Sequence, residues 1–309
     1  MKVTYSVVVP IFNEVESLPE LYQRVKKVMG GRGQSWELVL VDDGSTDGST
    51  EAIRRLAKGD AHVRPVIFAR NFGHQIAITA GWDYARGDAV VTIDGDLQDP
   101  PEAIPELARK WREGYEVVYG VRSEREGESW FKKATAALFY RVIYRITDVR
   151  IPVDSGDFRL MDRKVVNVLK QMRERHRFPR GMSAWVGFRQ VGVVYKRSPR
   201  YAGVTKYPFR RMLLLALNAI TSFSYFPLQV ATFFGFFSAG LAILAIPVVV
   251  YLRMAGIPQF TGQATTLIAV LFLGGIQLIS LGILGEYIGR LYDEAKGRPL
   301  YIVREGPSD

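Results

Sequence analysis

The stretch "AVVTIDGDLQDPPE", residues 89–102, joins an apolar strand to a group of carboxylates. The apolar run ends at Ile93, and Asp94, Asp96 and Asp99 follow within six positions. Residues two apart on an extended segment face the same side, so Asp94 and Asp96 can face one ligand. Carboxylates that repel one another become favourable around a divalent cation, which can also hold a diphosphate. We therefore expect Mg²⁺ or Mn²⁺ at these two residues, although an acidic turn after a strand is also common on solvated surfaces.

The chain before residue 130 alternates between apolar strands and segments of helical composition, such as residues 13–30 and 49–59. The expected strands are "YSVVVP" (5–10), "WELVLVDD" (36–43), "VRPVIFAR" (63–70), "AVVTID" (89–94) and "YEVVYG" (115–120). Strand and helix repeated in this way predict a mostly parallel sheet with helices on both faces. Ligands of such sheets bind beyond the carboxyl ends of the strands, where this chain places "PIFNE" (10–14), "DDGSTDGS" (42–49), "RNFGH" (70–74) and "DGDLQD" (94–99).

Several classes of site are excluded by the sequence. The chain has no cysteine, so disulfides, thiolate metal sites and cysteine nucleophiles are ruled out. A dinucleotide fingerprint and a Walker P-loop are both missing. An EF-hand requires glycine and glutamate where residues 94–105 have Asp99 and Pro105. The net charge of +10 indicates an anionic partner, but the basic residues gather beside the apolar C-terminal part, which argues against nucleic acid.

Two long stretches near the C-terminus carry no charged residue. Leu228 to Leu252 corresponds to about 37 Å of helix and Thr265 to Gly285 to about 31 Å, against roughly 30 Å of hydrocarbon in a bilayer. We therefore predict a transmembrane hairpin, with buried core helices as the alternative. The expected organisation is an α/β domain over 1–206, an interfacial amphipathic helix over 207–227, two spans within 228–289 (about 228–252 and 265–285) and a tail over 290–309.

Basic residues flank the predicted hairpin on one side. They are Lys196, Arg197, Arg200, Lys206, Arg210 and Arg211 before it, and Arg290, Lys296 and Arg298 after it. The positive-inside bias therefore predicts that the large domain and both termini are cytoplasmic, in an integral protein of the plasma or inner membrane. Residues 129–146 also mix aromatic and cationic side chains, which fits either the bilayer surface, ordinary packing or an oligomer contact. Glycines in the spans would permit close helix contacts, so a homo-oligomer is left open.

The four motifs at successive strand ends resemble those of the family-two glycosyltransferases, which have the GT-A (Rossmann-like) fold. Together with "SGDFRL" (155–160) and the hairpin, the whole chain resembles the polyisoprenyl-phosphate glycosyltransferases, especially those that glucosylate bactoprenol. The resemblance implies an inverting, metal-dependent transfer of a sugar from a nucleotide diphosphate to a polyisoprenyl phosphate. Glucose from UDP-glucose to undecaprenyl phosphate is the expected reaction, with GDP-mannose and UDP-linked aminosugars as alternative donors.

The resemblance also assigns residues to the site. The nucleotide sugar is expected at Pro10, Phe12, Asn13, Glu14, Asp42, Asp43, Arg70, Gly73, Asp94 and Gln98. The metal is expected at Asp94 and Asp96, and the catalytic carboxylate at Asp157. "DDGSTDGS" also suits a turn and a helix cap, and both roles can hold together. His74 is interpreted as a structural hydrogen-bonding residue.

The expected acceptor is a phosphate monoester, whose second pKa is about 6, so it scarcely needs a general base. Asp157 is therefore expected to orient a substrate. Arg122, Arg200 and Lys206 are the candidates for binding the acceptor phosphate, although the last two also fit plain membrane-surface charge. Two rival interpretations are an inactive nucleotide-sugar-binding paralogue and a processive synthase. The intact carboxylates argue against the first, and the absence of a Q-x-x-R-W motif and of further spans argues against the second.

Overall fold

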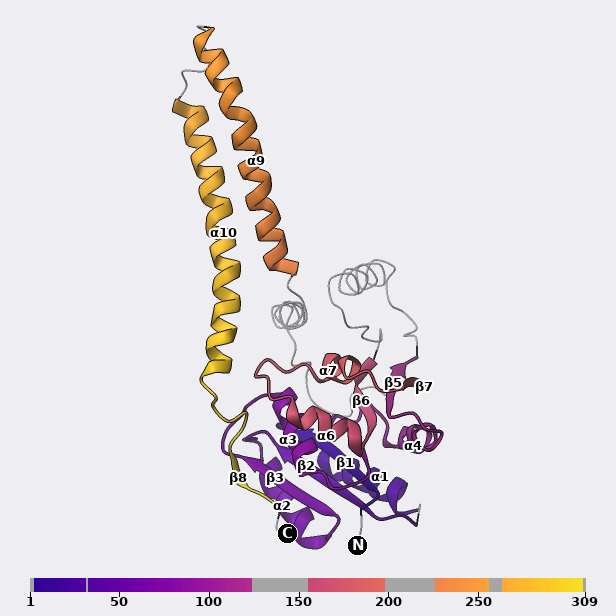
Figure 1. Cartoon of the computed structure of the whole chain (residues 1–309). Coiled ribbons are helices and arrows are strands. Elements are labelled where there is room, and N and C mark those ends of the chain that lie inside the picture. The colour runs from indigo at the N-terminus through magenta and orange to yellow at the C-terminus, as the bar shows by residue number, and fades with distance from the viewer. Residues whose placement is uncertain (1–2, 32, 124–154, 198–225, 256–262, 308–309) are drawn as a thin grey trace. The chain divides into compact units, whose positions relative to one another are not determined.

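The computed structural model describes residues 3–31, 33–123, 155–197, 226–255 and 263–307 (Figure 1). Within these residues two compact units separate: helices α9 and α10 form one, and all other elements form the other. The predicted interfacial segments, 207–227 and 129–146, lie almost entirely outside the described residues.

The α/β unit contains one sheet whose strand order is β7-β5-β6-β4-β1-β2-β3-β8. Its strands are β1 (Tyr5–Ile11), β2 (Trp36–Asp42), β3 (Val63–Phe68), β4 (Ala89–Thr92), β5 (Val117–Arg122), β6 (Ser155–Asp162), β7 (Gln190–Tyr195) and β8 (Val303–Glu305). Strands β1 to β4 are parallel to one another, whereas β6 and β8 run antiparallel to their neighbours. The predicted mostly parallel sheet is therefore confirmed, and all five predicted strands belong to it.

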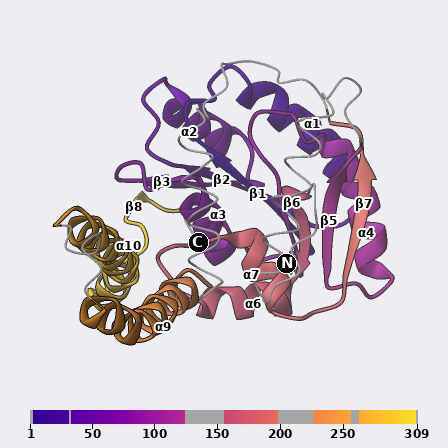
Figure 2. The same cartoon turned by 90° about the horizontal axis from the view of Figure 1, so that it is seen from above.

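Helices cover both faces of the sheet, as Figure 2 shows for α1 and α2 on one side and α3 and α6 on the other. The helices are α1 (Leu18–Gly30), α2 (Ser49–Gly59), α3 (His74–Tyr84), α4 (Ile104–Arg112), which follows the 3-10 turn Pro101–Ala103, α6 (Arg163–Gln171) and α7 (Pro179–Trp185). Alternate strand residues pack on opposite faces. Val7 joins the core under α1, α2 and α4, while Val8 faces α3.

The sheet contains three strands that the sequence patterns did not indicate. Strand β6 inserts between β4 and β5, and pairs with both in antiparallel orientation. Strand β7 extends the sheet beyond β5. The segment after α10, predicted only as a tail, returns to the sheet as β8 and pairs antiparallel with β3.

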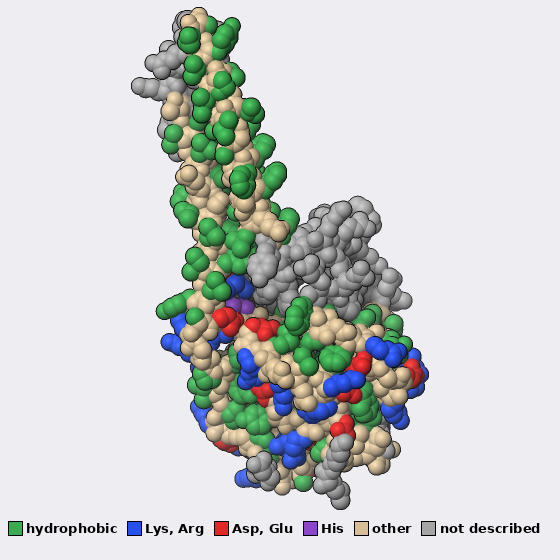
Figure 3. Space-filling model, viewed as in Figure 1, with side chains coloured by type: hydrophobic (Ala, Val, Ile, Leu, Met, Phe, Trp, Pro, Cys, Tyr) green, Lys and Arg blue, Asp and Glu red, His purple; other side chains and the backbone are tan. Residues whose placement is uncertain are grey.

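The second unit is a hairpin of two long helices, α9 (Phe226–Met254) and α10 (Gln263–Ala295). Each predicted uncharged stretch lies within one of these helices. The segments Phe226–Val248 and Phe272–Ala295 have mean hydropathies of 2.0 and 1.4 and are unburied within the structure. Figure 3 shows hydrophobic side chains along both helices. The helices are therefore long and apolar enough to cross a membrane.

Close packing of α3 on β1 gives a direct test of this architecture. A Cβ at Gly81 would lie 2.0 Å from Val8 Cγ1, so Gly81→Ala should destabilise the α/β unit by about 1–3 kcal/mol through overpacking. Gly59→Ala is the matched control, because nothing lies within 4 Å of the position its Cβ would take. Thermal unfolding of the full chain in detergent should show a lower melting temperature for the first variant only, and equal melting temperatures would contradict the packing described here.

Candidate active site

The loops after β1 and β2 are joined by hydrogen bonds. Asn13 has a φ of 55°, in the left-handed region that asparagine tolerates better than most residues. Its N–H donates to Ser45 Oγ at 3.0 Å, and its Oδ1 accepts from the N–H of Thr46 at 2.8 Å. The N–H of Glu14 donates to Ser49 Oγ at 3.0 Å. The two loops therefore form one rigid edge of the site, on which Phe12 remains 38% exposed.

Asp42 and Asp43 are both buried and both hold backbone. Asp42 accepts hydrogen bonds from the Ser45 N–H at 3.0 Å and from the Thr50 hydroxyl. Asp43 reaches the loop after β3, where it accepts from the N–H groups of Phe72 at 2.6 Å and Gly73 at 2.9 Å. Pro10 is the penultimate residue of β1 and is buried. The expected nucleotide residues that follow β1, β2 and β3 thus lie in loops that are fixed to one another.

Asp94 and Asp157 lie across from each other on neighbouring strands. The antiparallel register pairs Thr92 of β4 with Arg159 of β6, and continuing it by two residues sets Asp94 opposite Asp157. His74, the first residue of α3, lies between them: its Nε2 is 3.5 Å from Asp94 Oδ1 and 3.5 Å from Asp157 Oδ2. The sheet therefore brings the expected metal ligand and the expected catalytic carboxylate into one cluster.

The charges in this cluster determine its protonation. Burial opposes protonation of His74, yet Asp157 and Asp94 outweigh that effect and raise its pKa to about 9. Burial also raises the pKa of Asp94 to about 6, against the opposing charge of His74. For Asp157 burial would act in the same direction, but Arg180 and His74 hold its pKa well below its usual range. His74 is therefore cationic and Asp157 anionic at neutral pH.

Arg180 of α7 binds Asp157 through two hydrogen bonds. Its Nε donates to Oδ1 at 2.9 Å and its Nη2 to Oδ2 at 3.0 Å. This bidentate pairing fixes the carboxylate plane. Asp157 itself is only 3% exposed. A carboxylate held in this way is well placed to orient another group and poorly placed to accept a proton.

The acidic loop after β4 is tied to β5 and β7. Asp96 Oδ1 accepts the Gln98 N–H at 3.1 Å, and the side chain of Gln98 accepts from Arg197. Asp99 accepts a hydrogen bond from the Tyr195 hydroxyl. These contacts fix the loop from the far end of the sheet, so its carboxylates have defined positions.

Arg122, at the end of β5, lies beside this loop and beside Asp157. Its Nη2 is 4.0 Å from Asp99 Oδ1, and its Nε donates to the Tyr195 hydroxyl at 3.4 Å. A Cβ on Gly156 would lie 2.8 Å from Arg122 Nη2, so the guanidinium packs directly on the backbone next to Asp157. The structure therefore brings Arg122 to the carboxylate cluster. Arg200 and Lys206 lie outside the described residues.

The carboxylate group has the donor chemistry that a hard divalent cation needs. Among the described residues, Asp94 Oδ1 and Asp99 Oδ2 are buried and accept no hydrogen bond, although His74 Nε2 forms an ion pair with Asp94 Oδ1 at 3.5 Å. The Asp94 side chain as a whole is 26% exposed. Since Oδ1 is buried, the exposed part belongs to the other atoms of the side chain. Within the same described residues no group of three histidine, aspartate or glutamate side chains is arranged to hold a metal ion by itself. A cation at Asp94 and Asp96 would therefore take its remaining ligands from water and substrate, as Mg²⁺ commonly does.

The structure adds two residues that sequence reasoning missed, Arg180 and Tyr195. Neither belongs to one of the four motifs found in the sequence: Arg180 is in a short helix, and Tyr195 ends a strand whose pattern was not recognised. Only the pairing of β6 with β4 and of β7 with β5 brings them to the site.

Comparison with known proteins identifies the family. Residues 6–169 match the family described as glycosyl transferase family 2. The chain is 51% identical to the uncharacterized glycosyltransferase YkcC of Bacillus subtilis (strain 168), over 98% of this chain and 94% of that protein. It is 43% identical to the SfII prophage-derived bactoprenol glucosyl transferase of Shigella flexneri, over 97% of each chain.

Among solved structures, mannosyl-3-phosphoglycerate synthase from Rubrobacter xylanophilus aligns with a TM-score of 0.48 and 17% identity, over 71% of this chain and 72% of that one. The resemblance drawn from the strand-end motifs is confirmed by the family match and by the near full-length relatives. The chain belongs to glycosyltransferase family 2.

Proposed function

We propose that this glycosyltransferase moves glucose from UDP-glucose to the phosphate of a polyprenol, with inversion at the anomeric carbon. The observation that carries the proposal is the cluster of Asp94, His74, Asp157 and Arg180, where the carboxyl end of β4 meets the amino end of the antiparallel strand β6. It occurs in a chain that is 43% identical over nearly its full length to a protein named bactoprenol glucosyl transferase. Undecaprenyl phosphate is the proposed acceptor.

The donor nucleotide is proposed to bind over the joined loops after β1, β2 and β3. The exposed ring of Phe12 offers a surface for stacking. Arg70, in the same loop as Gly73, offers a cation. Asn13, Glu14 and Asp43 would act mainly by keeping these loops in place, because their hydrogen bonds to the neighbouring loops are already formed. Asp42 would do the same within the loop after β2, where it accepts the Ser45 N–H. Such preorganisation lowers the cost of ordering the site when the donor binds.

Asp94 and Asp96 are proposed to hold Mg²⁺ or Mn²⁺, with Gln98 fixing the loop between them and Asp99. A bound divalent cation supplies Lewis-acid stabilisation of the departing nucleotide diphosphate. The protein's own residues hold the ligands apart, since His74 contacts Asp94 on one side and the Gln98 N–H contacts Asp96 on the other.

The acceptor phosphate is proposed to bind near Arg122, with Arg200 and Lys206 as further candidates. A phosphate monoester is already anionic near neutral pH, so it attacks without giving up a proton to the protein. Asp157 is therefore proposed to orient a substrate hydroxyl or the His74 ring, rather than to act as a general base. The catalytic contribution of these residues is alignment and charge stabilisation.

Helices α9 and α10 are proposed to anchor the enzyme in the bilayer from which a polyprenyl phosphate is drawn. The basic residues that flank the hairpin in sequence support a cytoplasmic catalytic domain and cytoplasmic termini. A homo-oligomer stays a prediction from the glycines within the apolar stretches.

The proposal is tested by sugar transfer with the purified full chain. Radiolabelled UDP-glucose, GDP-mannose and a UDP-linked aminosugar are each offered with undecaprenyl or dolichyl phosphate. Lipid-linked glucose should form from UDP-glucose and undecaprenyl phosphate, should cease with EDTA and should return with Mn²⁺ or Mg²⁺. Asp94→Asn should lower kcat by about 10²-fold or more. Asp88→Asn, at the opposite end of β4, is the control and should retain activity.

Transfer from another donor would show that the sugar is not glucose. Binding of UDP without transfer to either lipid would instead indicate a nucleotide-sugar-binding protein. Transfer that is insensitive to EDTA would contradict the proposed metal.

The role of Asp157 is tested through the pH dependence of turnover. Asp157→Asn should lower kcat by about 10²-fold or more at every pH, because it removes the partner of Arg180 and His74. Complete recovery of the variant at high pH would contradict the orienting role and would indicate that Asp157 removes a proton.

Asp43 gives a prediction about stability and pH. Burial raises the pKa of Asp43 to about 6, and the hydrogen bonds from Phe72 and Gly73 offset only part of that rise. The folded chain therefore retains a proton on Asp43 up to about pH 6, whereas an unfolded chain retains it only to about pH 4. Between these values the folded state holds more protons, so the free energy of unfolding falls as pH rises, by roughly 2–3 kcal/mol for this group. Asp43→Asn should remove that component.

The comparison variant is Asp47→Asn in the same loop. Burial opposes ionisation of Asp47, but hydrogen bonds from the Ser49 hydroxyl and the Val15 N–H outweigh it and lower the pKa. Asp47 should therefore contribute with the opposite sign, adding stability that is lost as pH falls below about 4. Melting temperatures measured from pH 3.5 to 7.5 test both variants, and curves parallel to that of the wild type would refute the assignment for Asp43.

A further inference from the structure

The segment that follows α10 packs against the strand that leads into the Arg70–Gly73 loop. Val303 of β8 pairs with Phe68 of β3. Directly after β3, the N–H of Ala69 donates to the Ile302 carbonyl at 2.9 Å, and the Arg304 guanidinium donates to the Ala69 carbonyl at 3.2 Å. The C-terminal strand thus fixes the backbone immediately before the loop that borders the proposed nucleotide site.

Tyr301 is the centre of this contact. Its ring stacks on Phe68, with centroids 5.1 Å apart and planes 16° apart. Its hydroxyl donates to Asp83 Oδ2 at 2.8 Å. Asp83 Oδ2 also accepts a hydrogen bond from Arg173 Nη1 at 2.8 Å. Phe68 is only 1% exposed, so the stack is part of the interior.

The aromatic stack continues into the loop itself. Phe68 packs edge to face against Phe72, with centroids 5.6 Å apart, and the Arg70 guanidinium lies 4.1 Å from the centre of the Phe72 ring. A continuous row of side chains therefore runs from Tyr301 through Phe68 and Phe72 to Arg70. On the other side of the loop, Asp43 accepts the N–H groups of Phe72 and Gly73. The loop is held from two sides, by β2 and by the C-terminal segment.

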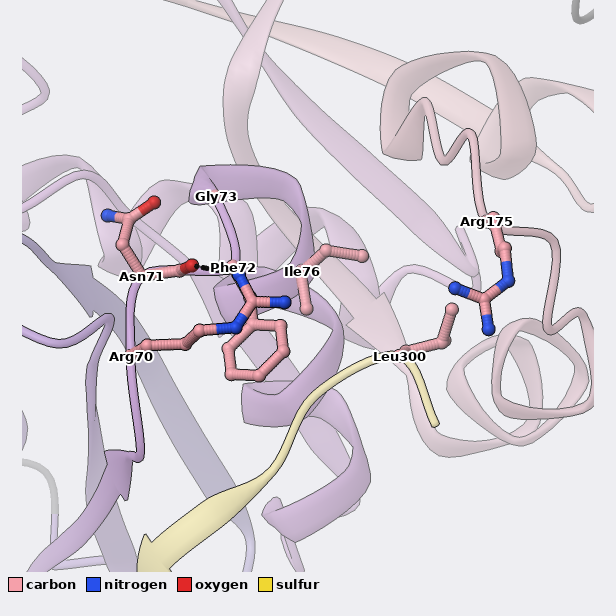
Figure 4. A pocket seen from close by; sticks show the side chains of 7 residues that line it. All are labelled: Arg70, Asn71, Phe72, Gly73, Ile76, Arg175 and Leu300. Atoms are coloured by element: carbon pink, nitrogen blue, oxygen red, sulfur yellow. Dashed lines mark hydrogen bonds between the residues drawn. The ribbon is translucent and has the colours of Figure 1, made fainter. Parts of the chain in front are cut away.

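The same segment also forms one wall of a cavity of about 320 Å³ beside the loop. The cavity is lined by Arg70, Asn71, Phe72, Gly73, Ile76, Arg175 and Leu300. Figure 4 shows the guanidinium groups of Arg70 and Arg175 reaching toward it from opposite sides. Arg175 also donates to the Arg298 carbonyl, so its position too depends on the chain after α10. A cavity with two cations and no acidic lining residue suits an anionic ligand such as a nucleotide.

We propose that Tyr301 is a positioning residue for the donor, because it supports the ring of Phe72 and thereby the guanidinium of Arg70. This inference rests on the proposed function, in which the Arg70–Gly73 loop borders the nucleotide. The donor site is then completed by residues that follow both apolar helices in the chain. A chain that ends before residue 298 would lack Leu300, which lines the cavity, and Tyr301, which stacks on Phe68 at the start of the row that leads to Arg70.

The test uses the full chain in detergent with UDP as the probe. Tyr301→Leu keeps apolar volume but removes the aromatic stack, and Tyr301→Phe keeps the stack but removes the hydrogen bond to Asp83. Calorimetric titration should show the dissociation constant of UDP rising about threefold to tenfold in the first variant and staying within about twofold in the second. The KM for the donor should rise in parallel, while kcat and the KM for the acceptor lipid stay unchanged.

Glu305→Gln is the matched control in the same strand. Glu305 binds Arg54 at the other end of β8 and pairs with Ile67, so its replacement weakens the strand away from the loop. The side chains of Glu305 and Arg54 are both more than a third exposed, so their ion pair adds little stability, and the variant should keep the dissociation constant of UDP that the wild type has. If Glu305→Gln weakens UDP binding as much as Tyr301→Leu does, Tyr301 acts only through general stability and the inference is wrong.

The outcomes also separate this inference from the proposed function. A wild-type chain that binds UDP and transfers sugar, with Tyr301→Leu unchanged in UDP affinity, would overturn the positioning role alone. A wild-type chain that neither binds UDP nor transfers sugar would overturn both.

Discussion

The antiparallel pairing of β6 with β4 is the constraint on which the site depends. Its register sets Asp94 opposite Asp157, which lie 63 positions apart in the chain but are brought next to each other by the sheet. Two carboxylates so close would repel one another strongly in a poorly solvated place. His74 between them and Arg180 behind Asp157 supply the positive charges that make the arrangement stable. The fold therefore requires the same ion pairs that the proposed mechanism would use.

The sequence predicts the parallel half of the sheet well, because β1 to β4 are apolar runs whose ends carry polar motifs. The spacing of Asp94 and Asp96 is a weak signal alone, and it gained weight only from the other motifs at successive strand ends; their role as metal ligands stays a prediction. The antiparallel strands could not be recognised in this way. Strand β6 contains Asp157 and Arg159, which read as solvated residues, yet each is only 3% exposed because each has a partner in the fold. Asp157 was therefore found through family resemblance, and its partner Arg180 was not found.

The C-terminal strand illustrates a second limit. Strand β8 has only three residues, and two of them, Arg304 and Glu305, are charged. This pattern is typical of a solvated tail. Pairing with β3 depends on Tyr301 and on an edge strand more than 230 residues earlier, and such non-local contacts leave no periodic signal in the sequence. The predicted interfacial helices and the acceptor candidates Arg200 and Lys206 stay predictions, because they lie outside the described residues.

The electrostatics of the site favour a reaction governed by charge placement rather than by proton transfer. Asp157 is bound by two cations, which lowers its pKa and so weakens it as a base. His74 is protonated by its two acidic neighbours, so it cannot accept a proton at neutral pH either. A phosphate monoester brings its own negative charge, so the proposed acceptor does not require Asp157 or His74 to be a base. The ion pairing of the cluster is thus compatible with the anionic acceptor of the proposed function, and Arg122, a proposed ligand of that acceptor, packs on the backbone beside Asp157.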